Sequence, residues 1–341
     1  MSTLTTESPT TEASAAPGHP ESAAPARIVV TGVGLAVSGA DTPRDLLAAR
    51  PGDAAPVDPA ARLGKKGLRY KDRATQLALC CARDALREAG MLGEDGALTV
   101  PGDGFAVLIA SDFGNVDTVC SIVETIAADG STAGLSPMDT PNASSNVIAS
   151  TLAVKYGLRG PNLMLCNGPT TGLDAVRWAA VLIRSGRADR ALVLGVEPDN
   201  AAVRRLAGTD RLIDGGAALI VERAGAGPAR GVTELAEIGA TTRTGGVRAC
   251  LDRLGAQAPA AWFGPGGGPE PAGGGPLPAE VSHYDLTGEW GEASAALGVL
   301  QCAAAVGWFA AGGAGPVYAV SGHDGDDGTA GLVLRAPGDL P

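Results

Sequence analysis

The chain has few of the side chains on which catalytic and metal sites usually depend. Only three of its 341 residues are histidines (His19, His283 and His323), and aromatic residues make up 4%. Its six cysteines form no C-x-x-C pair and have no spacing typical of a metal site. We therefore expect no metal ion and no cofactor, and we interpret the cysteines as reduced, mostly buried thiols.

The chain also lacks a block of lysine and arginine, and its formal net charge is −11. Because nucleic acids and anionic membranes attract basic surfaces, we expect neither as a partner. No apolar stretch is both long enough and sufficiently free of charge to span a bilayer. Residues 1–26 are rich in Ser, Thr, Ala and Pro and lack the apolar core of a signal peptide, so we predict a disordered tail on a cytoplasmic protein.

The remaining composition is typical of a well-buried α/β protein. Hydrophobic residues make up 45%, and the length allows one large core or two fused, similar halves. Residues 71–90 place apolar side chains at helical spacing, with Asp72 in the first turn and Gly90 at the end. Further helices are predicted over 171–185 and 292–310. Apolar strands are predicted at 27–37, 104–111, 162–166, 190–197, 214–221, 317–321 and 329–334.

The most informative segment is 160–174, GPNLMLCNGPTTGLD. It has a Gly-Pro pair, a short apolar strand, a turn of small residues and the start of a helix, and it resembles the segment that carries the nucleophile in β-ketoacyl synthases of fatty-acid and polyketide assembly. Pro141-Asn142-Ala143, followed by a helix ending at Tyr156-Gly157, matches another ketosynthase string, as does the strand that begins at Asp214-Gly215-Gly216. The resemblance spans residues 27–336 and is strong up to residue 222.

This resemblance implies a thiolase fold, in which two similar α/β halves form a five-layer αβαβα arrangement. The implied N-terminal half is 27–222. The implied C-terminal half is 223–341, is shorter than in the family, and contains a Gly- and Pro-rich loop at 264–278.

The residues needed for condensation are missing from the positions that the resemblance assigns to them. Counting from Gly160-Pro161 places Pro169 where the family has its reactive cysteine, and proline has no nucleophilic atom. The region matched to the first catalytic histidine, about 262–270, contains no histidine, and Glu289 occupies the position matched to the second. The oxyanion loop corresponds to 322–325, which includes His323. We therefore predict that the chain does not catalyse condensation.

Two other features of the sequence have a weaker claim to function. Cys166 lies three residues before Pro169 and is interpreted as a small buried hydrophobic residue rather than a replacement nucleophile. The acidic residues of 322–328 do not follow the calcium-loop pattern, which needs a downstream glutamate, so we expect a solvated loop.

Three hypotheses for the function remain. The first is a non-condensing partner subunit, similar to a chain-length factor, that forms a heterodimer with a ketosynthase subunit or a homodimer with itself through strand 162–166, and meets an acyl carrier protein transiently. The second is a carrier-dependent enzyme of altered chemistry (acyl transfer, dehydration or cyclisation) that uses Glu289 or His323 as acid or base. The third is a decayed copy without a biochemical role. The acyl substrate, the chain length and the identity of the partner stay open.

Overall fold

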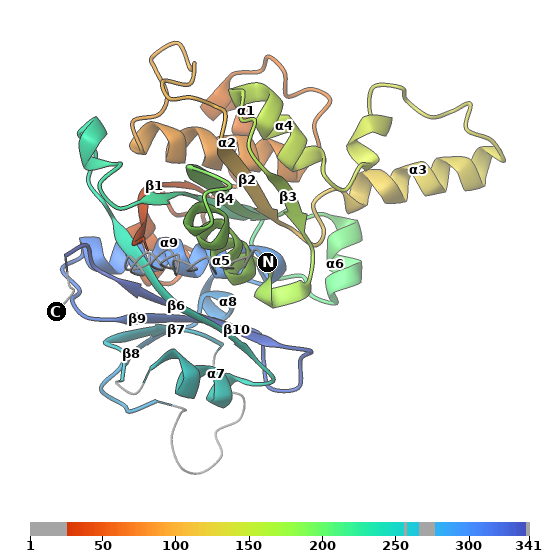
Figure 1. Ribbon diagram of the computed structural model, residues 1–341. Helices are drawn as coiled ribbons and strands as arrows, with labels where there is room; N and C mark the ends of the chain where they lie inside the picture. Colours follow the sequence, from red (N-terminus) through yellow and green to blue (C-terminus); the bar gives the residue numbers. More distant parts are fainter. Residues whose placement is uncertain (1–25, 256–257, 266–276, 339–341) are drawn as a thin grey trace, which may run out of the picture.

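The computed structural model describes residues 26–255, 258–265 and 277–338. Its strands follow one hydrogen-bonded order, β3-β2-β4-β5-β1-β6-β10-β9-β7-β8 (Figure 1). The strands are β1 (Ile28–Ala36), β2 (Phe105–Ala110), β3 (Asn162–Leu165), β4 (Arg190–Glu197), β5 (Gly215–Arg223), β6 (Ala236–Thr244), β7 (Ala261–Phe263), β8 (Ser282–Tyr284), β9 (Val317–Ser321) and β10 (Thr329–Arg335).

The helices alternate with these strands, as the pattern of apolar segments predicts. The α-helices are α1 (Pro59–Leu63), α2 (Arg73–Glu88), α3 (Val116–Asp129), α4 (Val147–Tyr156), α5 (Thr171–Arg184), α6 (Ala201–Ala207), α7 (Val247–Leu254), α8 (Leu286–Trp290) and α9 (Leu297–Ala310). Short 3-10 segments are η1 (Pro43–Leu47), η2 (Thr140–Ala143), η3 (Gly168–Thr170), η4 (Pro228–Arg230) and η5 (Ser294–Ala296).

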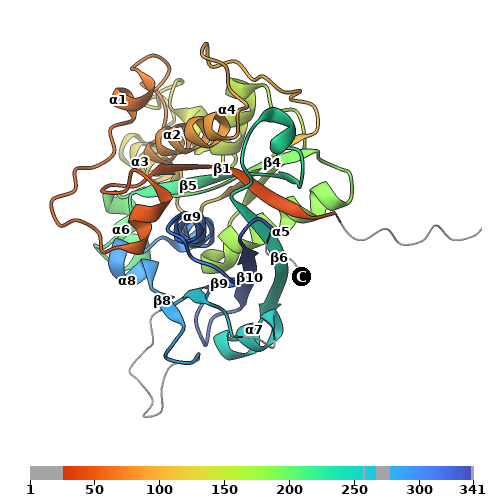
Figure 2. The ribbon, with the colours of Figure 1, turned by 90° about the vertical axis from the view of Figure 1, so that its left-hand side faces the viewer.

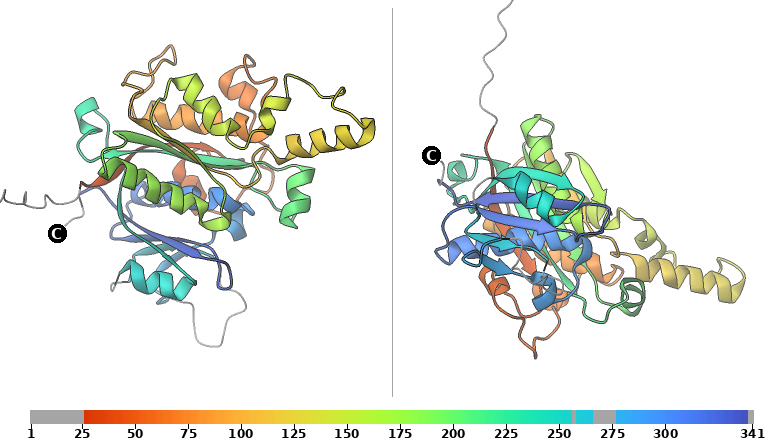
Figure 3. Two further views of the ribbon diagram at one scale, coloured as in Figure 1. Left: turned by 45° about the vertical axis from the view of Figure 1, so that its right-hand side comes forward. Right: turned by 90° about the horizontal axis from the view of Figure 1, so that it is seen from below.

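Strand β6 connects two layers of strands. The first residues of β6 pair with β1, and most of the strand pairs with β10, so the chain passes from one layer of strands to a second (Figure 2). Helices α5 and α9 lie between the two layers, α1, α2 and α4 cover the outer face of the first, and α7 covers that of the second (Figure 3). This five-layer αβαβα arrangement confirms the predicted fold class.

The buried side chains form three clusters that match these layers. The largest surrounds α5 and α9 between the two layers of strands, a second lies beneath α2 and α4, and a third lies beneath α7. The first eleven residues of α9 are all buried, and most of them are small, so the helix fits between two sheets. Gly172 and Gly298 let α5 and α9 approach closely, because a Cβ atom on Gly298 would lie 2.4 Å from the nitrogen of Leu173.

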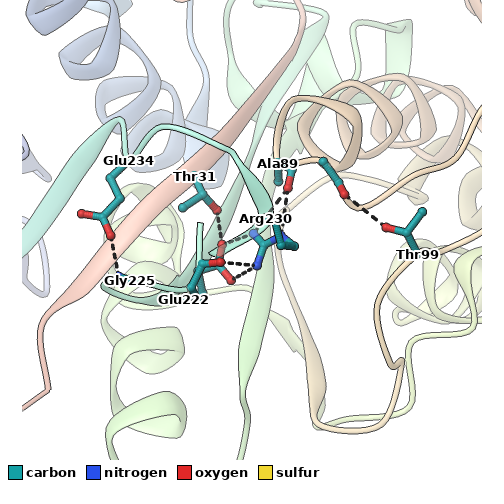
Figure 4. A network of polar contacts seen from close by, with 9 residues as sticks. Thr31, Ala89, Thr99, Glu222, Gly225, Arg230 and Glu234 are labelled. Carbon is teal, nitrogen blue, oxygen red and sulfur yellow. Dashed lines mark hydrogen bonds and ion pairs between the residues drawn. The ribbon is translucent and has the colours of Figure 1, made fainter. Parts of the chain in front are cut away.

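A buried ion pair fastens the connection between β5 and β6. Figure 4 shows Glu222 on β5 accepting hydrogen bonds from the hydroxyl of Thr31 at 2.6 Å and from the guanidinium of Arg230. The same guanidinium reaches the carbonyl of Ala89, which caps α2. Because each charged group has partners, the network stabilises the segment that leads into the second layer of strands.

Most elements predicted from the sequence are present, with shifted ends. Asp72 caps α2 and accepts a hydrogen bond from the nitrogen of Thr75 at 2.8 Å. The division into halves at 222–223 falls at the end of β5 and stays a prediction. Residues 1–25, with His19, and residues 266–276 lie outside the described part, so the proposed tail and most of the Gly- and Pro-rich loop are not tested. No helix in the described ranges is long and apolar enough to cross a membrane.

Candidate functional site

The turn between β3 and α5 contains Pro169. Gly168 has a φ of +73°, a left-handed conformation that glycine adopts readily, and this turns the chain sharply after the strand. The hydroxyl of Thr171 donates to the carbonyl of Gly168 at 2.6 Å and accepts from the nitrogen of Asn167 at 2.9 Å. Pro169 fits here because the first turn of a helix needs no hydrogen bond from its nitrogen. The turn is thus well formed, and the pyrrolidine ring of Pro169 lies at its centre.

A carboxylate from a neighbouring strand contacts this turn. Asp112 follows β2, and its Oδ1 accepts a hydrogen bond of 3.2 Å from the nitrogen of Gly168. Its Oδ2 accepts a hydrogen bond of 2.6 Å from the hydroxyl of Ser294, at the start of η5. Asp112 therefore connects the N-terminal end of α5 to the segment that leads into α9. Neither Asp112 nor Ser294 was predicted from the sequence to be a site residue.

Glu197, at the end of β4, holds Asp112 in place. Its carboxylate accepts hydrogen bonds from the nitrogens of Asp112 (2.6 Å) and Phe113 (3.1 Å) and from the hydroxyl of Ser111 (3.2 Å). Burial raises the pKa of Glu197 to about 8, because desolvation of the carboxylate outweighs the hydrogen bonds from the backbone, and the charge of Asp112 raises the pKa further. The sequence had shown Glu197 only as the end of a family-like strand.

Ser294 has an unusual backbone conformation. Its φ is +37°, and Asp214 is the one other non-glycine residue in the described ranges with a positive φ. The Ser294 nitrogen donates to the carboxylate of Glu292 at 2.8 Å, which fixes the residue where helix formation begins. Ser294, Glu292 and Phe113 line an open cavity of about 530 Å³. The other lining residues are Arg211 and four uncharged residues: Ala207, Thr209, Thr287 and Gly288.

The predicted acid–base residues do not share this cavity. Glu289 lies on α8, is exposed, and lines a separate cavity of about 370 Å³ that also has Asp210 and Asp214 in its wall. His323 is exposed in the turn between β9 and β10 and lines neither cavity. The backbone nitrogen of His323 donates to the carboxylate of Asp326 at 2.6 Å, as in a solvated turn. The carboxylate at the larger cavity is that of Glu292, three residues beyond Glu289.

Cys166 was predicted to be buried, and this is wrong. It is exposed, because it follows β3, which lies at the open edge of the sheet and pairs with β2 alone. Partial shielding of the thiol from water raises its pKa, and the charges of Asp112 and Glu197 raise it further. Since the thiolate is the reactive form, this environment disfavours Cys166 as a nucleophile. Of the other cysteines, Cys120 is half-buried and the remaining four are buried.

Several apolar side chains are exposed on the edge strand β3 and on helices α5 and α3. Leu163 on β3 is 37% exposed, and Trp178 on α5 is 47% exposed. Helix α3 buries no residue and extends away from the rest of the molecule (Figure 3). Its exposed apolar residues are Val119, Val123 and Ile126. An unpaired edge strand and apolar helix faces are features of surfaces that bind another protein.

In the described ranges, no three His, Cys, Asp or Glu side chains lie together in a way that could hold a metal ion.

Comparison with known proteins relates the chain to one family. The N-terminal domain model of the β-ketoacyl synthases matches residues 53–208. The 3-oxoacyl-[acyl-carrier-protein] synthase 2 of Coxiella burnetii is 30% identical over 141 residues, which are 41% of this chain and 33% of that protein. The tetracenomycin polyketide synthase ketoacyl synthase alpha subunit of Streptomyces glaucescens is 32% identical over 194 residues, 48% of this chain and 44% of that protein. The matched segments thus span less than half of these relatives.

Solved structures share the fold over nearly the whole chain. The ishigamide ketosynthase/chain length factor superposes with a TM-score of 0.73 at 21% identity and covers 92% of this chain and 100% of its own. A chain of the AntDE:AntF complex, a type II ketosynthase with its acyl-carrier protein, superposes with a TM-score of 0.68 at 16% identity, with coverage of 92% and 100%.

Proposed function

We propose that this chain, whose residues 53–208 match the N-terminal domain model of the β-ketoacyl synthases, is a member of that family and a non-condensing partner subunit of a β-ketoacyl synthase in polyketide or fatty-acid biosynthesis. In this role it resembles a chain-length factor. The observation that carries the proposal is Pro169, which occupies a well-formed turn. Counting from Gly160-Pro161 along the sequence assigns this residue to the position of the family's nucleophile. A subunit of this kind keeps the scaffold and leaves the covalent step to its partner.

The surroundings of Pro169 also oppose condensation. Condensation needs a thiolate to carry the acyl chain and hydrogen-bond donors to stabilise an enolate and an oxyanion. Here the carboxylate of Asp112 takes the hydrogen bond of the Gly168 nitrogen and places an acceptor beside the turn. A second negative charge about 4 Å from that carboxylate would cost roughly 4 kcal/mol at an effective dielectric constant of about 20.

The surface supports a partner at the β3 edge. The unpaired side of β3, with Leu163 and the apolar face of α5 near Trp178, offers backbone groups and apolar area to a second chain. A ketosynthase subunit in a heterodimer fits this surface, and a second copy of this chain in a homodimer is the alternative. An acyl carrier protein is the proposed transient partner of the assembly.

An enzyme of altered chemistry is the second candidate. The hydrogen bond of 2.6 Å between Ser294 and Asp112, beside an open cavity, is the observation that favours it. In such an enzyme the acid–base groups would be Asp112, Ser294 and Glu292, because Glu289 and His323 do not meet at that cavity.

Co-expression with ketosynthases encoded in the same gene neighbourhood, followed by size-exclusion chromatography with light scattering, tests the proposal. We expect a 1:1 heterodimer that Leu163→Asp disrupts. The control Leu206→Asp should leave it intact, since Leu206 is 59% exposed on α6 and is not part of the edge strand β3. Failure to pair with any such ketosynthase would contradict the proposal. Covalent acylation of the purified chain by an acyl thioester, detected by intact mass, would support the second candidate instead.

A further inference from the structure

The exposed face of α5 carries arginines without acidic partners. Arg177 and Arg184 lie on this helix, and Arg187 follows its last turn. All three are exposed, and within the described ranges none of them makes an ion pair. The sequence has no Asp or Glu between residues 175 and 188. In a chain whose formal net charge is −11, this face is a local excess of positive charge.

Two large apolar side chains lie on the same face. Trp178 is 47% exposed and Val181 is 41% exposed. Residues 177, 181 and 184 are separated by four and three positions, so they form one stripe along the helix. The α5 stripe is defined here as Arg177, Trp178, Val181, Arg184 and Arg187. An exposed indole between guanidinium groups suits a segment that offers both a carboxylate and an apolar surface.

The chain enters the described structure at one end of this stripe. The Nε of Arg184 donates a hydrogen bond of 3.4 Å to the carbonyl oxygen of Ala26, two residues before β1. Figure 3 shows the first residues of β1 beside the same end of the helix. Residues 1–25 are thus joined to the stripe by a short covalent connection, which gives them a high effective concentration there.

The composition of residues 1–25 is complementary to the stripe. Their charged side chains are three glutamates, Glu7, Glu12 and Glu21, and they contain no Asp, Lys or Arg. Pro17 and Pro20 have the P-x-x-P spacing, and Glu21 follows directly. Segments with this spacing bind exposed aromatic side chains in an extended polyproline form, which loses little entropy on binding.

The distances allow Glu21 to reach the far end of the stripe. Arg177 lies seven residues before Arg184, about 10 Å along the helix axis at 1.5 Å for each residue. Five residues separate Glu21 from Ala26, and they span up to about 16 Å in an extended chain. Glu21 is therefore the glutamate whose position along the chain matches the length of the stripe.

We propose that residues 17–25 dock on the α5 stripe, with Glu21 paired with Arg177 and Pro20 against the indole of Trp178. Trp178 also belongs to the surface proposed for the partner subunit, so the docked segment and the partner compete for it. Docking then weakens pairing until the partner displaces the segment. The docking concerns this chain alone, and only the competition rests on the proposed function.

Acrylamide quenching of tryptophan fluorescence in the full chain tests the docking. Residues 1–25 contain no tryptophan, and Trp262 and Trp290 are buried, so Trp178 gives most of the quenchable signal, with Trp178→Phe as the background. Deletion of residues 1–25 should raise the quenching constant of Trp178 by about twofold, because docking removes the exposed part of the indole from solvent. Salt at about 1 M should do the same in the full chain, since it shortens the screening length to about 3 Å, and should have little effect on the truncated chain.

Matched variants within the segment control for net charge. Glu21→Lys should expose Trp178 as the deletion does. Glu7→Lys makes the same change of charge fourteen residues farther from Ala26, and it should change the quenching constant by less than about a fifth, because its charge is screened from the stripe.

A second pair of variants changes the helix. Arg177→Glu/Arg184→Glu/Arg187→Glu should also expose Trp178, and deletion of residues 1–25 should then have no further effect. The control Arg44→Glu/Arg205→Glu/Arg253→Glu should leave Trp178 protected, since these arginines are exposed at other positions and make no ion pair in the part of the chain that the structure describes. Circular dichroism checks that all variants fold.

Three results would overturn the docking. The first is equal quenching in the full and truncated chains, and the second is an equal effect of Glu21→Lys and Glu7→Lys. The third is a quenching constant that changes with protein concentration while light scattering shows a dimer, since the segment of another copy would then be the occupant.

The competition has its own readout. Deletion of residues 1–25 should tighten pairing with the ketosynthase by about threefold or more in a titration, because it removes the docked form that cannot pair. Unchanged affinity overturns the competition and leaves the subunit role intact. Absence of any pairing overturns the proposed function together with the competition, while the quenching still decides the docking.

Discussion

The hydroxyl of Ser294 donates a hydrogen bond of 2.6 Å to Asp112, across 182 positions of sequence. This contact joins the start of η5 to the loop after β2, and Asp112 in turn accepts from the nitrogen of Gly168 beside Pro169. The turn that would carry a nucleophile is thus tied to a carboxylate and a hydroxyl.

The first prediction separates the hydrogen bond of Ser294 from its backbone strain. Ser294→Ala removes the bond, leaves Asp112 with one partner fewer and keeps the unfavourable φ of +37°, so it should lower the free energy of unfolding by about 1–3 kcal/mol. Ser294→Gly loses the same bond but relieves the strain. It should be more stable than Ser294→Ala by about 1 kcal/mol. Urea unfolding measures the free energy of unfolding of both variants. Equal stability of the alanine and glycine variants would contradict backbone strain at Ser294.

The second prediction concerns a thiol introduced at the turn. Pro169→Cys introduces a thiol at the position proposed for the family's cysteine, but Asp112 lies beside the turn and disfavours a thiolate there. We expect slow alkylation by iodoacetamide at pH 8 and no condensing activity. The double variant Pro169→Cys/Asp112→Asn should be alkylated roughly ten times faster, because a neighbouring charge shifts a pKa by about one unit or more.

Intact mass spectrometry follows the overall rate of this reaction, and peptide mapping of the alkylated chain separates the new thiol from Cys166. The control is Asp112→Asn alone, in which alkylation at residue 169 is impossible. Equal rates for the single and double variants would mean that the carboxylate does not act on the turn.

The third prediction is a pH dependence of stability. Glu197 has an ordinary pKa of 4.5 when unfolded and a pKa of about 8 when folded, so between these values the folded chain binds more protons than the unfolded chain. Stability must then fall as the pH rises from about 5 to 8, by a few kcal/mol in total at about 1.4 kcal/mol for each pH unit. Glu197→Gln keeps the shape and removes the titration.

Chemical denaturation at several pH values tests this. As the pH rises, the free energy of unfolding of wild type should fall relative to that of Glu197→Gln. A constant difference across that range would show that Glu197 does not titrate there.

The sequence predicts the framework well because periodicity and end signals are local. Asp72 and Gly90 mark the ends of α2 correctly to within a few residues, and the strands of the first layer are continuous apolar runs. Strands β7 and β8 have three residues each, too few to reveal a period, and none of the predicted strands corresponds to them. Helix α3 was also missed, although Val119, Val123 and Ile126 lie at helical spacing in the sequence.

The site was harder to predict because long-range contacts create it. Asp112 and Ser294 have no motif of their own, and only the fold brings the end of β2 to the start of η5. Cys166 was misjudged because an apolar strand has the same sequence at the edge of a sheet as in its middle. The sequence pointed to Glu289 as the carboxylate of the site. In the structure Glu289 lines a separate cavity, and Glu292, three residues later, lines the larger one. The assignment of Pro169 to the nucleophile position, made by counting along the sequence, stays a prediction.

The last prediction tests the contact between the two central helices. Gly298→Ala would place a methyl group 2.4 Å from the nitrogen of Leu173 and 2.8 Å from the carbonyl carbon of Gly172, so α9 must move away from α5. Overpacking of this kind costs about 1–3 kcal/mol in free energy of unfolding. The control Gly52→Ala adds a methyl group with no atom within 4 Å and should change stability by less than about 0.5 kcal/mol. Because α9 begins just after Ser294, the shift of α9 in Gly298→Ala should also weaken the hydrogen bond from Ser294 to Asp112. The double variant Gly298→Ala/Ser294→Ala should therefore lose less free energy of unfolding than the sum of the losses in the two single variants. Strict additivity in urea unfolding would mean that the helix contact and the polar contact are independent.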